Sequence, residues 1–214
     1  GEDAAAAAEV TAADTEQDGG GNGEARTEPR VKPPRPLATV IIPNYNGESV
    51  LQECLAAVKR QSYKPVQIIV VDDASTDQSL MIAEQFFDGV EVIRRPENRG
   101  FAATVNAGIK AARGKHIAVL NNDTKAEPGW LASAIKVFAR MPDVGVVASK
   151  ILTFDAPPRI YSVGIGVTRS GYTFNIGQGT AENGQFNHGR YVLGASGAAA
   201  VFRREVFEIV GSFD

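Results

Sequence analysis

The sequence predicts an α/β fold, in which helices cover both faces of a doubly wound, mostly parallel sheet. Three observations predict it. Short aliphatic runs recur from residue 37 onward, and each is four or five residues long, which is typical of strands. Consecutive positions in these runs are apolar, as in strands that are buried on both faces. Segments with helical spacing separate the runs, and this alternation of strands and helices is typical of a parallel sheet.

Five strands are expected in order, at 39–42, 67–71, 90–93, 117–120 and 144–148. Four apolar stripes with helical spacing follow the first four strands. Their members are Val50, Leu51, Cys54, Leu55 and Val58, then Leu80, Ala83, Phe86 and Phe87, then Phe101, Val105 and Ile109, and finally Leu131, Ala134, Ile135 and Phe138. Pro128 is expected in the first turn of the last helix.

Residues 1–36 differ in composition from the rest of the chain. They hold eight acidic and four basic residues, no aromatic residue and almost no branched aliphatic residue. Such a segment cannot bury enough apolar surface to offset the entropy of ordering it. We therefore expect an acidic, proline-rich and disordered tail at 1–36 and one folded domain at 37–214.

Overall composition excludes several classes of protein. Of the 214 residues, 43% are hydrophobic and 22% are charged, which argues against a wholly disordered or fibrous chain. The formal net charge of −3 argues against a nucleic-acid-binding domain. No apolar run approaches the roughly 20 residues of a membrane span. The single cysteine, Cys54, fits a reducing compartment, so a cytoplasmic location is expected. Because residue 1 is glycine, we expect a fragment or a processed product.

Polar residues follow each of the first four strands, where doubly wound sheets bind ligands. The four segments are Pro43-Asn44-Tyr45-Asn46-Gly47-Glu48, Asp72-Asp73-Ala74-Ser75-Thr76-Asp77, Asn98-Arg99-Gly100 and Asn121-Asn122-Asp123-Thr124. Helix capping explains Ser75, Thr76 or Asp77 equally well. It explains Asp72 and Asp73 poorly, because two adjacent carboxylates at a buried strand end repel each other. Asp123 has the character of a ligand for a hard cation such as Mg²⁺.

Together these segments resemble the nucleotide-sugar half of family 2 glycosyltransferases, which have the GT-A fold. The matching stretches are Ile41–Asn46, Val70–Asp77, Asn98–Gly108 and Leu120–Thr124. Gly194–Ala199, Arg203–Phe207 and Gly211–Asp214 extend the match. The resemblance implies a nucleotide-binding half at 37–125 and a partial acceptor half at 126–214.

The resemblance also implies how a nucleotide-diphosphate sugar donor is bound. Asp73 or Asp72 would accept the N3–H of uracil or thymine, because an ionised carboxylate only accepts hydrogen bonds. Pro43 and Tyr45 would line the base pocket, where stacking on a tyrosine ring is worth roughly 1–3 kcal/mol. Core packing is the alternative for Tyr45. Glu48 would lie near the ribose or the phosphates.

Four further residues are expected at the donor. They are Asn46, Arg99, Asn106 and Asn122. Arg99 would meet the donor through its charge and the helix dipole, or it would be a solvated loop arginine. Asn106 would help to orient the base-reading aspartate.

A divalent cation is the expected cofactor. The family's Asp-x-Asp motif reads Asn121-Asn122-Asp123 here, so Asp123 would be the remaining carboxylate ligand of Mg²⁺ or Mn²⁺. We expect the metal to arrive largely with the nucleotide, whose pyrophosphate oxygens complete its shell. Ala195, Ser196 and Gly197 would lie on the side of the acceptor and the donor sugar.

The general base is expected beyond Asp214, so this chain is expected to bind donor with little or no transfer. The resemblance implies an inverting hexosyl or deoxyhexosyl transfer from a UDP- or dTDP-sugar to a glycan or lipid-linked acceptor, in cell-wall or polysaccharide synthesis. Peripheral association with the inner face of a membrane stays open, as does the oligomeric state. One alternative is a non-catalytic nucleotide-sugar-binding module, which Asn121 and the missing base favour. The other is a sugar-phosphate nucleotidyltransferase, which would need a Gly-rich basic loop after the first strand.

Overall fold

The computed structural model describes residues 6–9, 35–85 and 87–214. The helices of these segments are α1 (Leu51–Lys59), α2 (Ser79–Gln85), α3 (Gly100–Ala111), α4 (Trp130–Arg140) and α5 (Arg204–Val210). The strands are β1 (Ala6–Glu9), β2 (Ala38–Asn44), β3 (Val66–Asp72), β4 (Val90–Arg94), β5 (His116–Leu120), β6 (Thr124–Ala126), β7 (Val146–Ala148), β8 (Lys150–Thr153), β9 (Ile160–Ser162), β10 (Ile165–Val167), β11 (Thr173–Asn175) and β12 (Ala199–Arg203).

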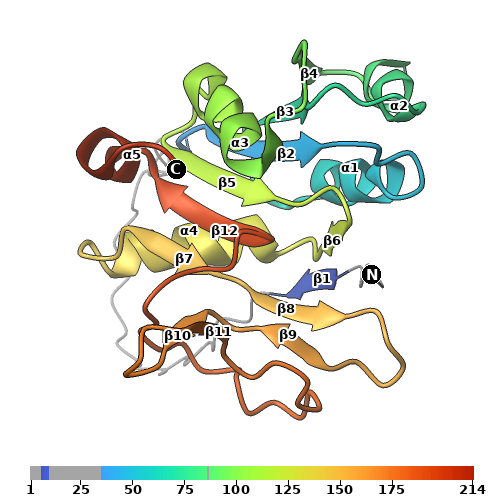
Figure 1. The fold of residues 1–214 in the computed structure, drawn as a ribbon. Helices are drawn as coiled ribbons and strands as arrows, with labels where there is room; N and C mark the ends of the chain where they lie inside the picture. Colours follow the sequence, from blue (N-terminus) through green and yellow to red (C-terminus); the bar gives the residue numbers. More distant parts are fainter. Residues whose placement is uncertain (1–5, 10–34, 86) are drawn as a thin grey trace, which may run out of the picture.

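The main sheet has the strand order β4-β3-β2-β5-β12-β7, as Figure 1 shows. The first four strands pair in parallel, and β12 pairs antiparallel with both β5 and β7. All five predicted strands are present, so the prediction of a mostly parallel α/β sheet is confirmed. The strand β12 was not predicted, and it lies between two predicted strands, β5 and β7.

Two hydrophobic cores form because side chains alternate across the sheet. In β2, Val40 and Ile42 are buried in the core that includes α1 and α4. Ile41, between them in sequence, belongs to the core on the other face, which packs against α3 and α5. The sheet therefore has helices on both faces.

Three details differ from the sequence prediction. The edge strand β4 is only partly buried, because it has a neighbour on one side alone. On α3, Val105 is fully buried, but Phe101 is 42% exposed. Phe87 lies beyond the end of α2 and still packs against the core, whereas Phe86 is outside the described residues.

A second sheet has the order β6-β1-β8-β9, and β10 pairs with β11. The strand β1 lies within the segment that was expected to be disordered. Apart from Ala6–Glu9, Arg35 and Pro36, that segment lies outside the described residues. Among the described helices, none has the length and apolar character needed to cross a membrane.

Candidate functional site

The polar residues predicted to form a site gather at one edge of the main sheet. Because β2, β3 and β5 are parallel, their carboxyl ends meet there. Because β12 is antiparallel to β5, its amino end reaches the same edge. The backbone N–H of Asn121 donates to the carbonyl oxygen of Ala198 at 2.9 Å, which fixes the segment before β12 beside the end of β5.

Asn44 joins three of these strand ends and is 2% exposed. Its Nδ2 lies 3.0 Å from Asp72 Oδ1 and 2.9 Å from Ser79 Oγ. Its Oδ1 accepts a hydrogen bond of 2.8 Å from Asn122 Nδ2. Asn44 is not among the predicted site residues, although its amide directly follows a predicted strand and precedes the predicted residue Tyr45.

Gly47 lets the loop after β2 pass over this network. A Cβ atom at position 47 would lie 2.3 Å from both Asn122 Nδ2 and Asn44 Oδ1. Real Cβ atoms do not approach other atoms this closely. Any side chain at position 47 would therefore displace one of the two amides.

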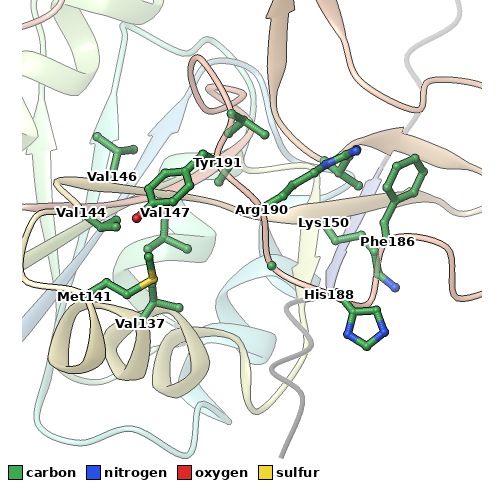
Figure 2. A pocket seen from close by; sticks show the side chains of 14 residues that line it. Val137, Met141, Val144, Val146, Val147, Lys150, Phe186, His188, Arg190 and Tyr191 are labelled. Carbon is green, nitrogen blue, oxygen red and sulfur yellow. The ribbon is translucent and has the colours of Figure 1, made fainter.

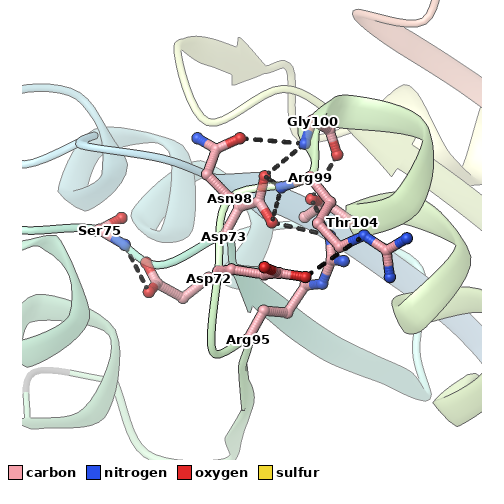
Figure 3. Close-up of polar contacts among 9 residues, drawn as sticks. Asp72, Asp73, Ser75, Arg95, Asn98, Arg99, Gly100 and Thr104 are labelled. Carbon is pink, nitrogen blue, oxygen red and sulfur yellow. Dashed lines mark hydrogen bonds and ion pairs between the residues drawn. The ribbon is translucent and has the colours of Figure 1, made fainter.

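Asp72 and Asp73 are both buried, and their carboxylates turn to different partners, as Figure 3 shows. Besides Asn44, Asp72 accepts a hydrogen bond of 3.1 Å from the backbone N–H of Ser75. Asp73 accepts hydrogen bonds from the backbone N–H groups of Arg99 and Gly100, at 3.1 and 2.9 Å. These two donors belong to the first turn of α3, so the Asp73 carboxylate also lies where the helix dipole favours negative charge.

Arg95 compensates the charge of Asp73 and was missed by the sequence analysis. Its Nη1 lies 2.8 Å from Asp73 Oδ1, and the two side chains are only 12% and 4% exposed. The same nitrogen donates to Thr104 Oγ1 at 3.0 Å. A carboxylate can accept about four hydrogen bonds. Asp73 receives four such contacts from three donors, two at each oxygen, because the Arg99 N–H also lies 3.2 Å from Oδ1.

The loop between β2 and α1 is tied to the loop between β3 and α2. Asn46, at φ +50°, accepts a hydrogen bond of 2.8 Å from the N–H of Thr76 through its Oδ1. Glu48 Oε2 accepts one of 3.2 Å from the N–H of Gln78. Pro43 lies within β2 itself. These contacts hold the two loops in place around Tyr45.

Tyr45 is 51% exposed, so ordinary core packing does not explain it. It directly follows Asn44, and the carbonyl oxygen of Asn44 accepts a hydrogen bond of 2.8 Å from the N–H of Asp73. The tyrosine and the second aspartate are therefore held beside each other at the sheet edge.

Asp123 follows Asn122 and borders a small hollow of about 60 Å³. The hollow also contacts Ser49, Val50 and Glu53 at the start of α1. Among the described residues, no group of three or more His, Cys, Asp or Glu side chains gathers as a metal site. Within the same part of the chain, the buried Asn121 Oδ1 has no hydrogen-bond partner. One carboxylate and one amide oxygen, two residues apart, are ligands of the kind that Mg²⁺ and Mn²⁺ accept. The residues present thus fit a cation that takes most of its other ligands from molecules other than this chain.

Three predicted site segments have structural partners. The side chain of Arg99 is 65% exposed and lies 3.7 Å from Glu97. The Asn106 amide donates to the carbonyl oxygen of Phe213 at 2.7 Å and accepts from its N–H at 3.0 Å. Asn106 thereby fastens the end of the chain to α3 instead of orienting Asp73. The segment Ala195–Gly197 precedes β12, and a Cβ at Gly197 would lie 3.3 Å from the Phe101 ring.

A larger cavity, of about 340 Å³, lies elsewhere, between α4, β7 and the segment 186–192 (Figure 2). Most of its lining side chains are apolar, with Lys150, His188 and Arg190 at one end. The Nζ of Lys150 already contacts Glu182 at 3.2 Å and Asn187 at 2.8 Å. None of the predicted site residues lines this cavity. We therefore place the candidate site at the strand ends, although this cavity is larger than the hollow beside Asp123.

Comparison with known proteins identifies the family. The sequence model of glycosyl transferase family 2 matches residues 39–211, which is most of the chain. The chain belongs to glycosyl transferase family 2. An uncharacterized glycosyltransferase of Rickettsia prowazekii is 32% identical over 112 residues, which cover 52% of this chain and 35% of the relative. The family match favours a glycosyltransferase over the sugar-phosphate nucleotidyltransferase alternative.

Two solved structures share the fold. A mannosyltransferase of Pyrobaculum calidifontis, solved with GDP-Man and Mn²⁺, has a TM-score of 0.60 at 22% identity, over 84% of this chain and 48% of that one. The S. aureus protein TarS 1-349, solved with UDP-GlcNAc, has a TM-score of 0.57 at 20% identity, over 80% of this chain and 46% of that one. The predicted GT-A fold is confirmed. This chain spans about a third to a half of the length of the proteins it matches.

Proposed function

We propose that this family 2 glycosyltransferase chain binds a nucleotide-diphosphate sugar at the edge formed by β2, β3 and β5. The observation that supports the proposal is that the buried Asn44 joins the ends of β2, β3 and β5. Tyr45, Asp73 and Asp123 directly follow or adjoin the residues in these contacts. The half-exposed ring of Tyr45 would stack on the base. Asp73, at the end of the neighbouring strand β3, would read the base edge.

The base would be uracil or thymine, since an ionised carboxylate accepts the imide N3–H of either and does not suit cytosine, whose N3 carries no hydrogen. One structural neighbour was solved with GDP-Man and the other with UDP-GlcNAc. The neighbours therefore do not decide between bases, and the proposal for UDP or dTDP depends on Asp73.

Asp123 would hold Mg²⁺ or Mn²⁺ together with phosphate oxygens of the donor. When bound, the cation would supply positive charge that stabilises the departing diphosphate. The segment Ala195–Gly197, at the same edge, would face the donor sugar or the acceptor. The sugar would pass, with inversion, to a hydroxyl of a glycan or a lipid-linked acceptor. A carboxylate beyond Asp214 would act as the general base.

Isothermal titration of the chain with UDP, dTDP, GDP and NAD, with and without Mn²⁺, tests the proposal. We expect Mn²⁺-dependent binding of UDP or dTDP, and we expect Asp123→Asn to remove the metal dependence. Asp143→Asn is the matched control, because Asp143 precedes β7 at the opposite edge of the sheet. Absence of nucleotide binding, or binding that ignores both Mn²⁺ and Asp123, would contradict the proposal.

A transfer assay with the same chain tests whether a general base lies within the 214 residues. We expect nucleotide binding with little or no sugar transfer. Turnover at ordinary enzyme rates, on the order of 1–10³ per second, would show that the base lies within the 214 residues.

A further inference from the structure

The cavity between α4, β7 and the segment 186–192 has a volume of about 340 Å³ and two unlike ends (Figure 2). Pockets that bind small molecules begin at about 300 Å³. At one end the lining side chains are apolar, and they come from α4, from β7 and from the turn between them. They include Val137, Met141, Val144 and Val147. At the other end are Lys150, His188 and Arg190, whose side chains carry N–H donors.

The segment 186–192 is fastened near both of its ends, so it holds the cavity open. At its start, Asn187 Oδ1 accepts a hydrogen bond of 2.8 Å from the Nζ of Lys150, whose side chain is only 7% exposed. At its end, Val192 packs directly on the backbone of Gly164, where a Cβ atom would lie 2.8 Å from the valine side chain. The segment cannot move onto β7 without breaking these contacts. The cavity is therefore preformed, as is usual for small-molecule sites.

The charges at the polar end leave Arg190 as the group that can bind an anion. The positive charge of Lys150 is compensated by Glu182, at 3.2 Å. The Cζ of Arg190 lies 4.6 Å from the centre of the Phe186 ring, and within the described part of the chain Arg190 forms no ion pair. Arginine binds carboxylates and phosphates through two parallel hydrogen bonds. An oxyanion at this end would supply the charge that Arg190 lacks.

The opposite end disfavours an anion and suits an apolar chain. There the hydroxyl of Tyr191 lies 3.4 Å from the carboxylate of Asp143, whose negative charge would repel another anion. Between the two ends the walls are mostly apolar, so a hydrocarbon chain that enters leaves water favourably. A molecule that fits is therefore apolar along its length and negatively charged at one end.

We propose that this cavity binds one single-chain amphiphile whose end is an oxyanion, either a carboxylate or a phosphate. Arg190 binds the oxyanion, and His188 supplies a further N–H donor. The hydrocarbon chain lies against Val137, Met141 and Val144. The site shares no residue with the proposed nucleotide site, so it does not rest on the proposed function.

Isothermal titration of the full 214-residue chain with octyl phosphate and decyl phosphate tests the proposal, at concentrations below those at which they form micelles. We expect one molecule to bind per chain. Decyl phosphate should bind more tightly, by up to about fourfold for each extra methylene group that is buried. Octanol and octyltrimethylammonium carry the same chain without the anion, so each should bind at least about tenfold more weakly than octyl phosphate.

Two variants test the two ends separately. Arg190→Gln should weaken octyl phosphate binding about tenfold, because a charged hydrogen-bond donor is lost. Its matched control is Arg169→Gln, which changes another exposed arginine, in the turn between β10 and β11. Val137→Trp should fill the apolar end and weaken the binding of every probe. Its control is Val210→Trp, at a position on α5 that is 79% exposed.

Several results would overturn the proposal. Equal binding of octyl phosphate and octanol, or equal affinities in the two arginine variants, would remove the oxyanion from the site. Unchanged binding in a folded Val137→Trp variant would place the chain of the ligand elsewhere. Binding to phosphatidic acid vesicles without binding of the monomeric amphiphiles would assign the surface to a membrane. Both arginine variants change exposed side chains, so they decide the question even if Val137→Trp does not fold.

Discussion

The buried ion pair between Arg95 and Asp73 gives a quantitative prediction. Arg95→Met would remove the charged donor from a carboxylate whose side chain is only 4% exposed. Removing one partner of a buried pair typically costs about 3–5 kcal/mol. Asp73 would keep the backbone N–H groups of Arg99 and Gly100, so we expect the low end of that range, about 3 kcal/mol. For a chain of this size, that loss lowers Tm by about 6–12 °C.

The neighbouring residue provides a matched control. Arg94 also pairs with a carboxylate, that of Glu84, but its side chain is 63% exposed. Exposed pairs contribute little to stability, so Arg94→Met should leave Tm almost unchanged. Urea unfolding and thermal melts of the two variants compare the same substitution at adjacent positions. A loss for Arg95→Met no larger than that for Arg94→Met would refute the idea that burial makes this pair important.

Three further predictions follow from local packing. Gly47→Ala should lower the unfolding free energy by about 1–3 kcal/mol through overpacking. Gly129→Ala should not, because a Cβ there would lie 4.0 Å from Ser133 Oγ, an ordinary contact distance; thermal melts compare the two variants. Burial raises the pKa of the Cys54 thiol to about 12, so iodoacetamide at pH 8 should modify it only after urea unfolding, and rapid modification of the native chain would contradict this. Burial lowers the pKa of His116 below its usual 6.5, and the positive charges of Lys115 and Arg203 lower it further. The His116 side chain therefore binds a proton more readily in the unfolded chain than in the folded one. Stability should therefore fall as the pH drops below about 6.5 and level off below the folded-state pKa, and urea unfolding at several pH values should show a smaller slope for His116→Phe.

The local sequence predicted the main architecture because the buried parallel strands and their helices carry strong local patterns. The stripe Leu51, Cys54, Leu55 and Val58 is an example, since all four side chains are buried. By contrast, the strands of the second sheet have only three or four residues, too few to establish a period. Their pairing is decided by distant segments.

The sequence predicts which strand ends form the site. It does not predict which side chains contact each other there. Asn44 and Asn122 are 78 residues apart in sequence, and no local pattern links them. Arg95 has the same residue type as Arg94, and only the fold distinguishes the buried one from the exposed one. Asn106 lies on α3 as expected, but its amide binds the backbone of Phe213. The donor base, the metal and the acceptor stay predictions.

The position of β12 has a consequence for synthesis of the chain. Its first residue, Ala199, pairs with Leu120 of β5, so β5 has an open edge until the segment that contains β12 has left the ribosome. During that interval an apolar strand, Ile117–Leu120, is available to other nascent chains, and such edges promote aggregation. This edge of β5 can close only after that later segment arrives, so synthesis of β12, and not formation of the first strands, is the step that protects the chain.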